Sequence, residues 1–516
     1  MVGFEREPIS RNVGASSAIS LSASAVNYKQ LTVKIGSLLL FTLILLLPAL
    51  SFSATYYVSN GGDDSNAGTQ ALPWETLHKV NATNLTPGDQ VLFQRGGVFP
   101  GSLQPATSGT KGNPIAYGAY GSGNRPTLDA TGQYAGIGVR NKGYLEFRDL
   151  EVRNATAQGF FSLDSNNNIT INRVRAGNNG LNGINASDGG GSLINNTFII
   201  KNTEADHNTA MGMALSSLTN SLIQGNTATY NCQSMACGDA CTWCGGIRMT
   251  NTTSIGNIVE NNETSYNTYG AGIWVDFNGQ GEIVRYNKTH HNVVGIYNEI
   301  TSGSEIYGNL SYENATGIWL SGRQGEAPYN GPAIGNKVYN NTVYHNGSWG
   351  ILLQNDDGIT GNCHDNAIMN NIVAATTSGP NLRIGGGAET EPNSIDHNAF
   401  GPESANMFEI GWGAYRSTYA SLEQWYGKST NSIKSDPTFM NATGGDFALS
   451  PGSAGIDGGL NLGAPYNMGL SATSVWPSGV VLIDRGAAWD IGAYEYVRSA
   501  PPDTTSPSAP RGLVIK

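Results

Sequence analysis

Two carboxylates occupy the same position in consecutive copies of a short repeated segment. Asp276 ends the segment GIWVD, and Glu299 ends the segment GIYNE. Side chains alternate between the faces of a strand and neighbouring strands lie about 5 Å apart, so we expect both carboxyls to point outward, side by side. Like charges that close raise one pKa and leave a protonated acid beside a carboxylate. Glycoside hydrolysis requires such a pair, and a short separation favours the retaining mechanism.

Aromatic residues precede the acids in the same segments. Trp274, Tyr297 and Trp319 each stand two residues after the Gly of their copy, in a column that Arg248 begins. Exposed apolar surfaces usually mark contact sites, and three rings at strand spacing would offer sugars a platform about 10 Å long. We expect the three rings, Arg248 and Arg323 to bind the substrate. The alternatives are that inserted loops cover the rings, and that the acids are solvated or pair with the two arginines.

The elements that must position these residues are strands of a repeat over about 145–375. Segments such as NETSYN and NTVYHN start at intervals of 23, 36, 25, 22, 32 and 30 residues. The shortest intervals match one turn of a parallel β-helix, and the longer ones add an insertion. Each coil needs its neighbours to bury its apolar face. The residues that follow the repeated Gly are therefore expected to stack inward: Ile247, Ile273, Ile296, Ile318 and Ile351.

The repeat also accounts for the abundance of asparagine. Asn tolerates the left-handed backbone of tight corners, and Asn side chains at one corner of successive coils can form a hydrogen-bonded ladder. Several of these residues also fit the glycosylation pattern N-x-S/T, for example Asn287. We favour the ladder, which explains them without glycans.

The chain resembles the right-handed parallel β-helix proteins of the pectin-lyase-like group. The resemblance covers roughly residues 55–500 and includes an opening segment, TYYVSNGGDDSNAGT, and a closing segment that ends in DIGAYEY. It implies an all-β fold, a right-handed solenoid with coils of roughly 22–25 residues and loop insertions. The expected domain spans 54–500, with the closing segment at about 400–497. The group includes polysaccharide lyases, glycoside hydrolases, epimerases and non-catalytic surface proteins, so the fold does not decide the reaction.

The amino-acid composition limits the classes of partner that the protein is expected to bind. Among 516 residues, 13% are charged and the net charge is −11, whereas nucleic-acid binding needs clustered Lys and Arg. We therefore expect a polysaccharide partner, no nucleic acid and a monomer. The 39% of hydrophobic residues exclude ordinary disorder.

Both ends of the chain lie outside the solenoid. Residues 1–53 read as a secretory signal with a long leading region, because the apolar run Leu38–Leu47 is followed by the small residues Ser51 and Ser53. The alternative is an uncleaved anchor, and we expect no membrane span in the mature chain. Residues 498–516 read as a Pro/Ser/Thr-rich linker and resemble the start of a fibronectin type III module. The predicted location is secreted or at the cell surface.

Four cysteines fall within one insertion: Cys232, Cys237, Cys241 and Cys244. Export permits disulfides, while four thiolates suit zinc, so disulfides or a metal site are the alternatives. No cofactor is required by the leading interpretation. Calcium is a candidate for the acidic loop DDGITGNCHD, which begins at Asp356.

The leading hypothesis is a glycoside hydrolase with Asp276 and Glu299 as its catalytic residues. A polysaccharide lyase of the pectate or alginate type is the enzymatic alternative, because EIVRYNKTHHN, which contains Lys288, resembles a strand of alginate- and chondroitin-type lyases. A non-catalytic glycan-binding protein of the cell surface is the third alternative.

Overall fold

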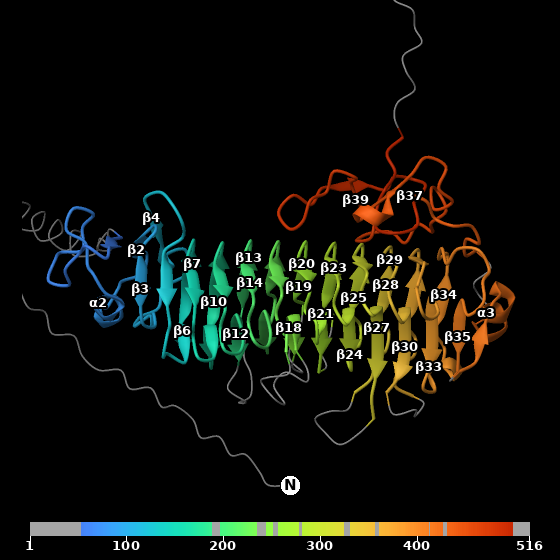
Figure 1. The fold of residues 1–516 in the computed structure, drawn as a ribbon, viewed down its shortest axis with the longest axis horizontal. Coiled ribbons are helices and arrows are strands. Elements are labelled where there is room, and N and C mark those ends of the chain that lie inside the picture. The colour runs from blue at the N-terminus through green and yellow to red at the C-terminus, as the bar shows by residue number, and fades with distance from the viewer. Residues whose placement is uncertain are drawn as a thin grey trace, which may run out of the picture. The chain divides into compact units, whose positions relative to one another are not determined.

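The structure is a computed structural model that describes residues 53–187, 197–234, 244–250, 256–277, 281–324, 331–356, 361–411, 413–426 and 431–498. The predicted signal, Cys237, Cys241 and almost all of the C-terminal linker lie outside these residues. Successive coils stack along one axis (Figure 1), and each inner coil adds one strand to each of three parallel sheets.

The first sheet, sheet A, has thirteen strands among the described residues. Their bounds are β1 (Thr55–Val58), β2 (Gln90–Gln94), β4 (Ile115–Tyr120), β7 (Gly143–Arg148), β10 (Asn167–Asn172), β13 (Phe198–Lys201), β16 (Leu222–Gln224), β19 (Ile258–Glu260), β22 (Ile283–Arg285), β25 (Glu305–Tyr307), β28 (Lys337–Tyr339), β31 (Ala367–Met369) and β34 (Ser394–Asp396).

Sheet B follows sheet A in every coil except those of β1 and β34, and its described strands have only three residues each. They are β3 (Val98–Pro100), β5 (Thr127–Asp129), β8 (Glu151–Arg153), β11 (Arg175–Gly177), β14 (Glu204–Asp206), β17 (Thr227–Thr229), β20 (Glu263–Ser265), β23 (Lys288–His290), β26 (Leu310–Tyr312), β29 (Thr342–Tyr344) and β32 (Ile372–Ala374).

Sheet C contains the longest strands and completes each coil. Its strands are β6 (Ala135–Arg140), β9 (Gln158–Leu163), β12 (Ile184–Ser187), β15 (Met213–Ser216), β18 (Gly245–Thr250), β21 (Ala271–Asp276), β24 (Val294–Glu299), β27 (Thr316–Gly322), β30 (Trp349–Asn355), β33 (Leu382–Gly385), β35 (Phe408–Ile410) and the antiparallel β36 (Tyr415–Arg416).

The core is the column of isoleucines that the repeat predicts. Ile247 pairs with Ile273, Ile273 with Ile296, and the pairing continues through Ile318 and Ile351. All five side chains are fully buried. Crossovers between parallel strands are right-handed in nearly all sheets, and the fold is a right-handed parallel β-helix, as predicted.

Asparagine ladders run along the corners of the coils. Between sheets A and B, side-chain amides link Asn226, Asn262, Asn287, Asn309, Asn341, Asn371 and Asn398 at 2.9–3.0 Å. A second ladder, between sheets B and C, contains Asn231, Asn267 and Asn292. Asn287 is fully buried, which supports the ladder over a glycan.

One detail of the ladder prediction is wrong. The left-handed backbone belongs to the residue before each ladder Asn, as at Tyr266 before Asn267 and Tyr286 before Asn287. In some coils this preceding residue is itself an asparagine, as at Asn261, Asn340 and Asn370, so asparagine does adopt the left-handed backbone at the corner, one residue before the ladder.

The described C-terminal residues form a closing segment outside the coils. It includes two antiparallel hairpins, β37 (Phe439–Asn441) with β38 (Asp446–Leu449), and β39 (Met468–Leu470) with β40 (Leu482–Asp484). Its aromatic residues pack on tyrosines next to sheets A and B, and Trp476 Nε1 donates to the Tyr286 carbonyl at 2.8 Å. The red segment in Figure 1 therefore leaves sheet C uncovered by these hairpins.

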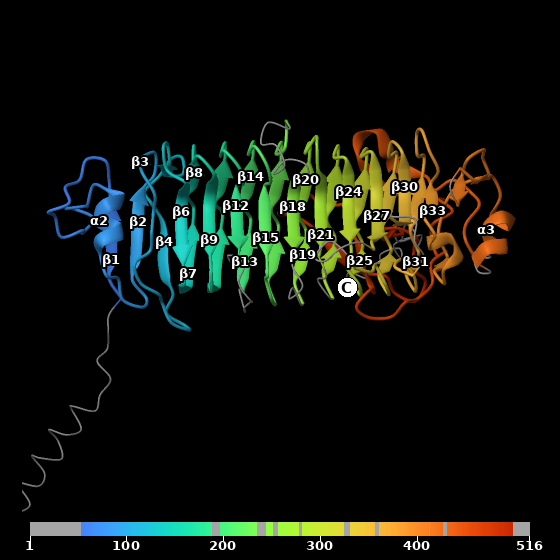
Figure 2. The same ribbon diagram turned by 90° about the horizontal axis from the view of Figure 1, so that it is seen from below.

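Short helices occur at both ends of the stack (Figure 2), α2 (Leu77–Ala82) and α3 (Tyr419–Tyr426). Two 3₁₀ turns, η2 (Ala388–Thr390) and η3 (Ala442–Gly444), complete the helical elements of the described residues. No helix in the described part of the chain has the length and apolar character that crossing a membrane requires.

Candidate active site

The two predicted catalytic carboxyls stand on adjacent strands of sheet C (Figure 2). Trp274 pairs with Tyr297 and Val275 with Asn298, so Asp276 and Glu299 follow in register as the last residues of β21 and β24. Both side chains are buried, with exposed fractions of 1% and 5%. The register inferred from the Gly-Ile repeat is therefore correct, and the two acids occupy one outward column.

Asp276 is held by an arginine on the preceding strand. Nη2 of Arg248 lies 2.5 Å from Oδ2 of Asp276. Burial raises the pKa of Asp276 to about 6, and the Arg248 guanidinium opposes the rise. Asp276 therefore remains mostly ionised at neutral pH.

Glu299 has weaker cationic support. Nη1 of Arg323 lies 4.0 Å from its Oε1. Burial, together with the charges of Asp276 and Asp356, raises the pKa of Glu299 to about 8, and a hydrogen bond from Tyr297 and the charge of Arg323 oppose the rise. Burial thus raises the pKa of Glu299 further above its ordinary value than that of Asp276, because Arg248 contacts Asp276 directly whereas Arg323 lies farther from Glu299.

The aromatic column exists but is not the open platform that the sequence suggested. Trp274 stacks on Tyr297 with 5.5 Å between ring centroids, and Tyr297 stacks on Trp319 at 4.5 Å. Trp274 and Tyr297 are only 3% and 6% exposed, which favours the covered alternative for these two rings. Arg248 lies 4.2 Å above the Trp274 ring. The ring faces are therefore occupied by one another, and a ligand could reach only their edges.

The solvent side of the site carries polar groups. Arg323 retains 41% of its side-chain exposure, and Asp356 is exposed. Among the described residues, neither Nε of Arg248 nor Nε1 of Trp319 has a hydrogen-bond partner. Both nitrogens are buried, so they lie beneath the solvent side of the site.

Asp356 was not recognised from the sequence as part of this site. Gln354 pairs with Ser321 in the column of the acids, and Asp356 follows two residues later on the same face. The separation of two residues between Gln354 and Asp356 is the sequence feature that could have placed Asp356 in this site. The acidic-loop interpretation had assigned Asp356 to a calcium site instead.

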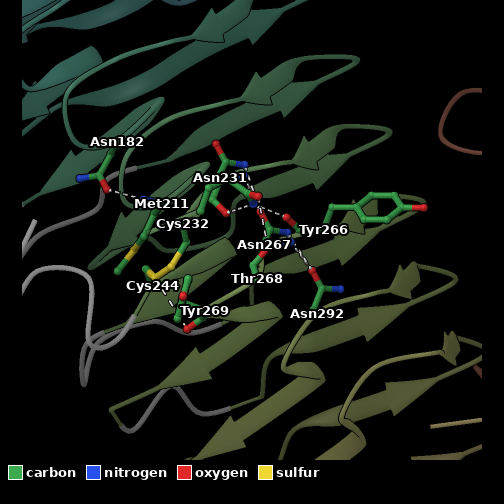
Figure 3. Close-up of a disulfide and its surroundings, with 11 residues drawn as sticks. Asn182, Met211, Asn231, Cys232, Cys244, Tyr266, Asn267, Thr268, Tyr269 and Asn292 are labelled. Carbon is green, nitrogen blue, oxygen red and sulfur yellow. Dashed lines mark hydrogen bonds between the residues drawn. A yellow bond between two sulfur atoms is a disulfide. The ribbon is translucent and has the colours of Figure 1, made fainter. Parts of the chain in front are cut away.

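The cysteine insertion contains a disulfide. Cys232 and Cys244 are joined, beside Met211 and the ladder residues Asn231 and Asn267 (Figure 3). This bond favours the disulfide alternative for Cys232 and Cys244, and the zinc alternative stays an untested prediction. Cys237 and Cys241 lie outside the described residues.

The described residues include no group of three or more His, Cys, Asp or Glu side chains placed to hold a metal ion. Asp357, the second carboxylate of the proposed calcium loop, lies outside them. Calcium stays an untested prediction.

Comparison with known proteins agrees with the class that the fold defines. Residues 135–311 match the family described as "Right handed beta helix region". This match and the coils themselves make the protein a right-handed parallel β-helix protein.

Particular relatives are carbohydrate-active. A lacto-N-biosidase from Bifidobacterium longum subsp. longum is 33% identical over 145 residues, which are 22% of this chain and 9% of that protein. The matched part thus spans about a tenth of that relative's length. A solved GH136 lacto-N-biosidase from Eubacterium ramulus is 16% identical, with TM-score 0.38 over 70% of this chain and 66% of that one. A solved pectate lyase is 16% identical, with TM-score 0.46 over 87% and 97%.

Proposed function

We propose that this protein is a secreted or cell-surface glycoside hydrolase that cleaves a polysaccharide or oligosaccharide at the outward face of sheet C. Glu299 is the general acid and Asp276 is the carboxylate that acts on the anomeric carbon. The observation that carries the proposal is the buried pair of carboxyls whose surroundings favour opposite protonation states. A structural role does not need such a pair, whereas acid–base catalysis does.

The reaction follows from these protonation states. The Glu299 carboxyl gives its proton to the glycosidic oxygen while the Asp276 carboxylate attacks the anomeric carbon, and the carbon–oxygen bond to the leaving sugar breaks. The resulting glycosyl ester is hydrolysed by a water whose proton returns to Glu299. Adjacent strands are about 5 Å apart, the separation expected of retaining enzymes.

The basic residues of the site support hydrolysis over elimination. A lyase needs a base that removes a proton beside a uronate carboxyl, whereas the basic side chains next to the acids, Arg248 and Arg323, are each engaged by one of those acids. Lys288 is on sheet B, where its Nζ contacts Glu263 at 3.0 Å. The matched segment of a lacto-N-biosidase supports the same choice.

Incubation of the protein with a panel of neutral and acidic glycans tests the proposal. We expect new reducing ends without ultraviolet absorption from an unsaturated sugar. Glu299→Gln and Asp276→Asn should each lower the rate about 100- to 10,000-fold. Glu313→Gln is the matched control, because this carboxyl lies at an exposed corner and pairs with His291.

Three outcomes would contradict the proposal. Unsaturated products would identify a lyase. Stable retention of an intact glycan without any product would identify a binding protein. Full activity of both acid variants would exclude the assigned pair.

A further inference from the structure

A cavity lies on sheet B, between that sheet and the closing segment. It has a volume of about 300 Å³, and Lys288 and Leu310 line it from the coils. The other lining residues come from the closing segment: Gly444, Gly445, Asp446, Ala472, Ser474, Val475, Trp476 and Tyr494. Ligand sites range upward from about this volume, so the space suits one small ring.

The lining changes from the floor to the rim. Leu310 and Tyr494 are buried and form the floor, while Lys288, Asp446 and Trp476 are half-buried walls. Ala472 and Val475 are exposed at the rim. A ligand would therefore meet an indole, a carboxylate and an ammonium group within one opening.

The charges at the walls favour a neutral ligand. Lys288 is neutralised by Glu263, because its Nζ lies 3.0 Å from the Glu263 carboxylate. Asp446 uses Oδ1 to accept from the Ala448 backbone N–H at 3.0 Å. Its carboxylate would repel an anionic ligand, whereas it can accept hydrogen bonds from hydroxyl groups.

We propose that this cavity is a non-catalytic binding site for a single neutral sugar residue. The Trp476 indole supplies the apolar contact, and Asp446 and Lys288 supply the polar contacts. The indole is held in place because its Nε1 donates to the Tyr286 carbonyl. The site is on sheet B and therefore does not overlap the acids of sheet C. This role rests on the proposed hydrolase function. The cavity would retain one part of a glycan while the acids of sheet C cleave another part of the same glycan.

The test measures binding of D-glucose, D-galactose, N-acetyl-D-glucosamine and D-galacturonate to the full chain by saturation-transfer NMR. We expect saturable binding of at least one neutral sugar, with a dissociation constant of the order of 1 mM, as is usual for so small a ligand, and no binding of galacturonate. Ala472→Trp fills the rim and should weaken binding at least tenfold. Thr473→Trp is the matched control, because Thr473 is exposed but does not line the cavity.

Separate outcomes distinguish this site from the acids of sheet C. Glu299→Gln should abolish cleavage and leave the Ala472-sensitive binding unchanged. The proposal is overturned if no neutral sugar shows binding that Ala472→Trp removes, or if galacturonate binds as well as the neutral sugars. Asp446→Asn provides a check that keeps the side chain's shape, and it should also weaken binding.

Discussion

A carboxyl stands where other coils place an amide. Glu282 is fully buried, and its Oε1 accepts from Asn257 Nδ2 at 3.1 Å. In later coils, this corner before sheet A is an amide ladder that links Asn336 to Asn366. Among the described residues, neither Oε2 of Glu282 nor Oγ of Ser304 has a hydrogen-bond partner. Glu282→Gln would replace the acid with the amide that the ladder uses elsewhere.

The size of the effect follows from the pKa of Glu282. Burial raises this pKa from 4.5 to about 7, opposed by the hydrogen bond from Asn257. The folded state therefore keeps its proton over a pH range in which the unfolded chain loses it, so stability falls as pH rises from 4.5 to 7 and then levels off. At about 1.4 kcal/mol per pKa unit, the cost above pH 7 is about 3 kcal/mol.

Urea unfolding of the wild-type and Glu282→Gln proteins at pH 4 and pH 8 measures this cost. We expect the variant to gain about 3 kcal/mol at pH 8 and almost nothing at pH 4. Glu75→Gln is the control, because this side chain is exposed and should give no pH-dependent gain. An equal gain at both pH values, or a loss at pH 8, would refute the argument that the buried carboxyl resists ionisation.

Three further predictions concern the site and the coils. The kcat/KM for cleavage should peak between about pH 6 and 8, because Asp276 must be ionised and Glu299 protonated; a rate that rises steadily to pH 10 would contradict these roles. Asn267→Ala should lower the free energy of unfolding by about 2–3 kcal/mol by leaving ladder partners unsatisfied, whereas an unchanged urea midpoint would count against the ladder. Reducing the Cys232–Cys244 disulfide should lower the free energy of unfolding by up to about 3 kcal/mol. The measurement is a lower Tm in the presence of reductant. A variant with alanine at both Cys232 and Cys244 should not show this decrease.

The repeat made the coils and their register predictable. Residues at the same position of successive repeats lie next to each other on adjacent coils. The Gly-Ile pattern was therefore enough to align Asp276 with Glu299. The same alignment placed Trp274 beside Tyr297.

Contacts that do not recur from coil to coil could not be predicted from the repeat. The burial of Trp274 and Tyr297 depends on what covers sheet C, and no periodic pattern encodes that covering. The contact between Trp476 and Tyr286 joins residues 190 positions apart. The influence of Asp356 on Glu299 likewise depends on a charge two coils away.

The ladders give the stack a direction. Every side-chain bond from Asn226 to Asn398 runs the same way, with the earlier coil as donor and the later coil as acceptor. The last amide in this series gives its backbone N–H to Oγ of Ser432. The two ends of the solenoid are therefore chemically unlike, and α2 and α3 close different surfaces (Figure 2). If a terminal helix were lost, copies could extend one another only head to tail.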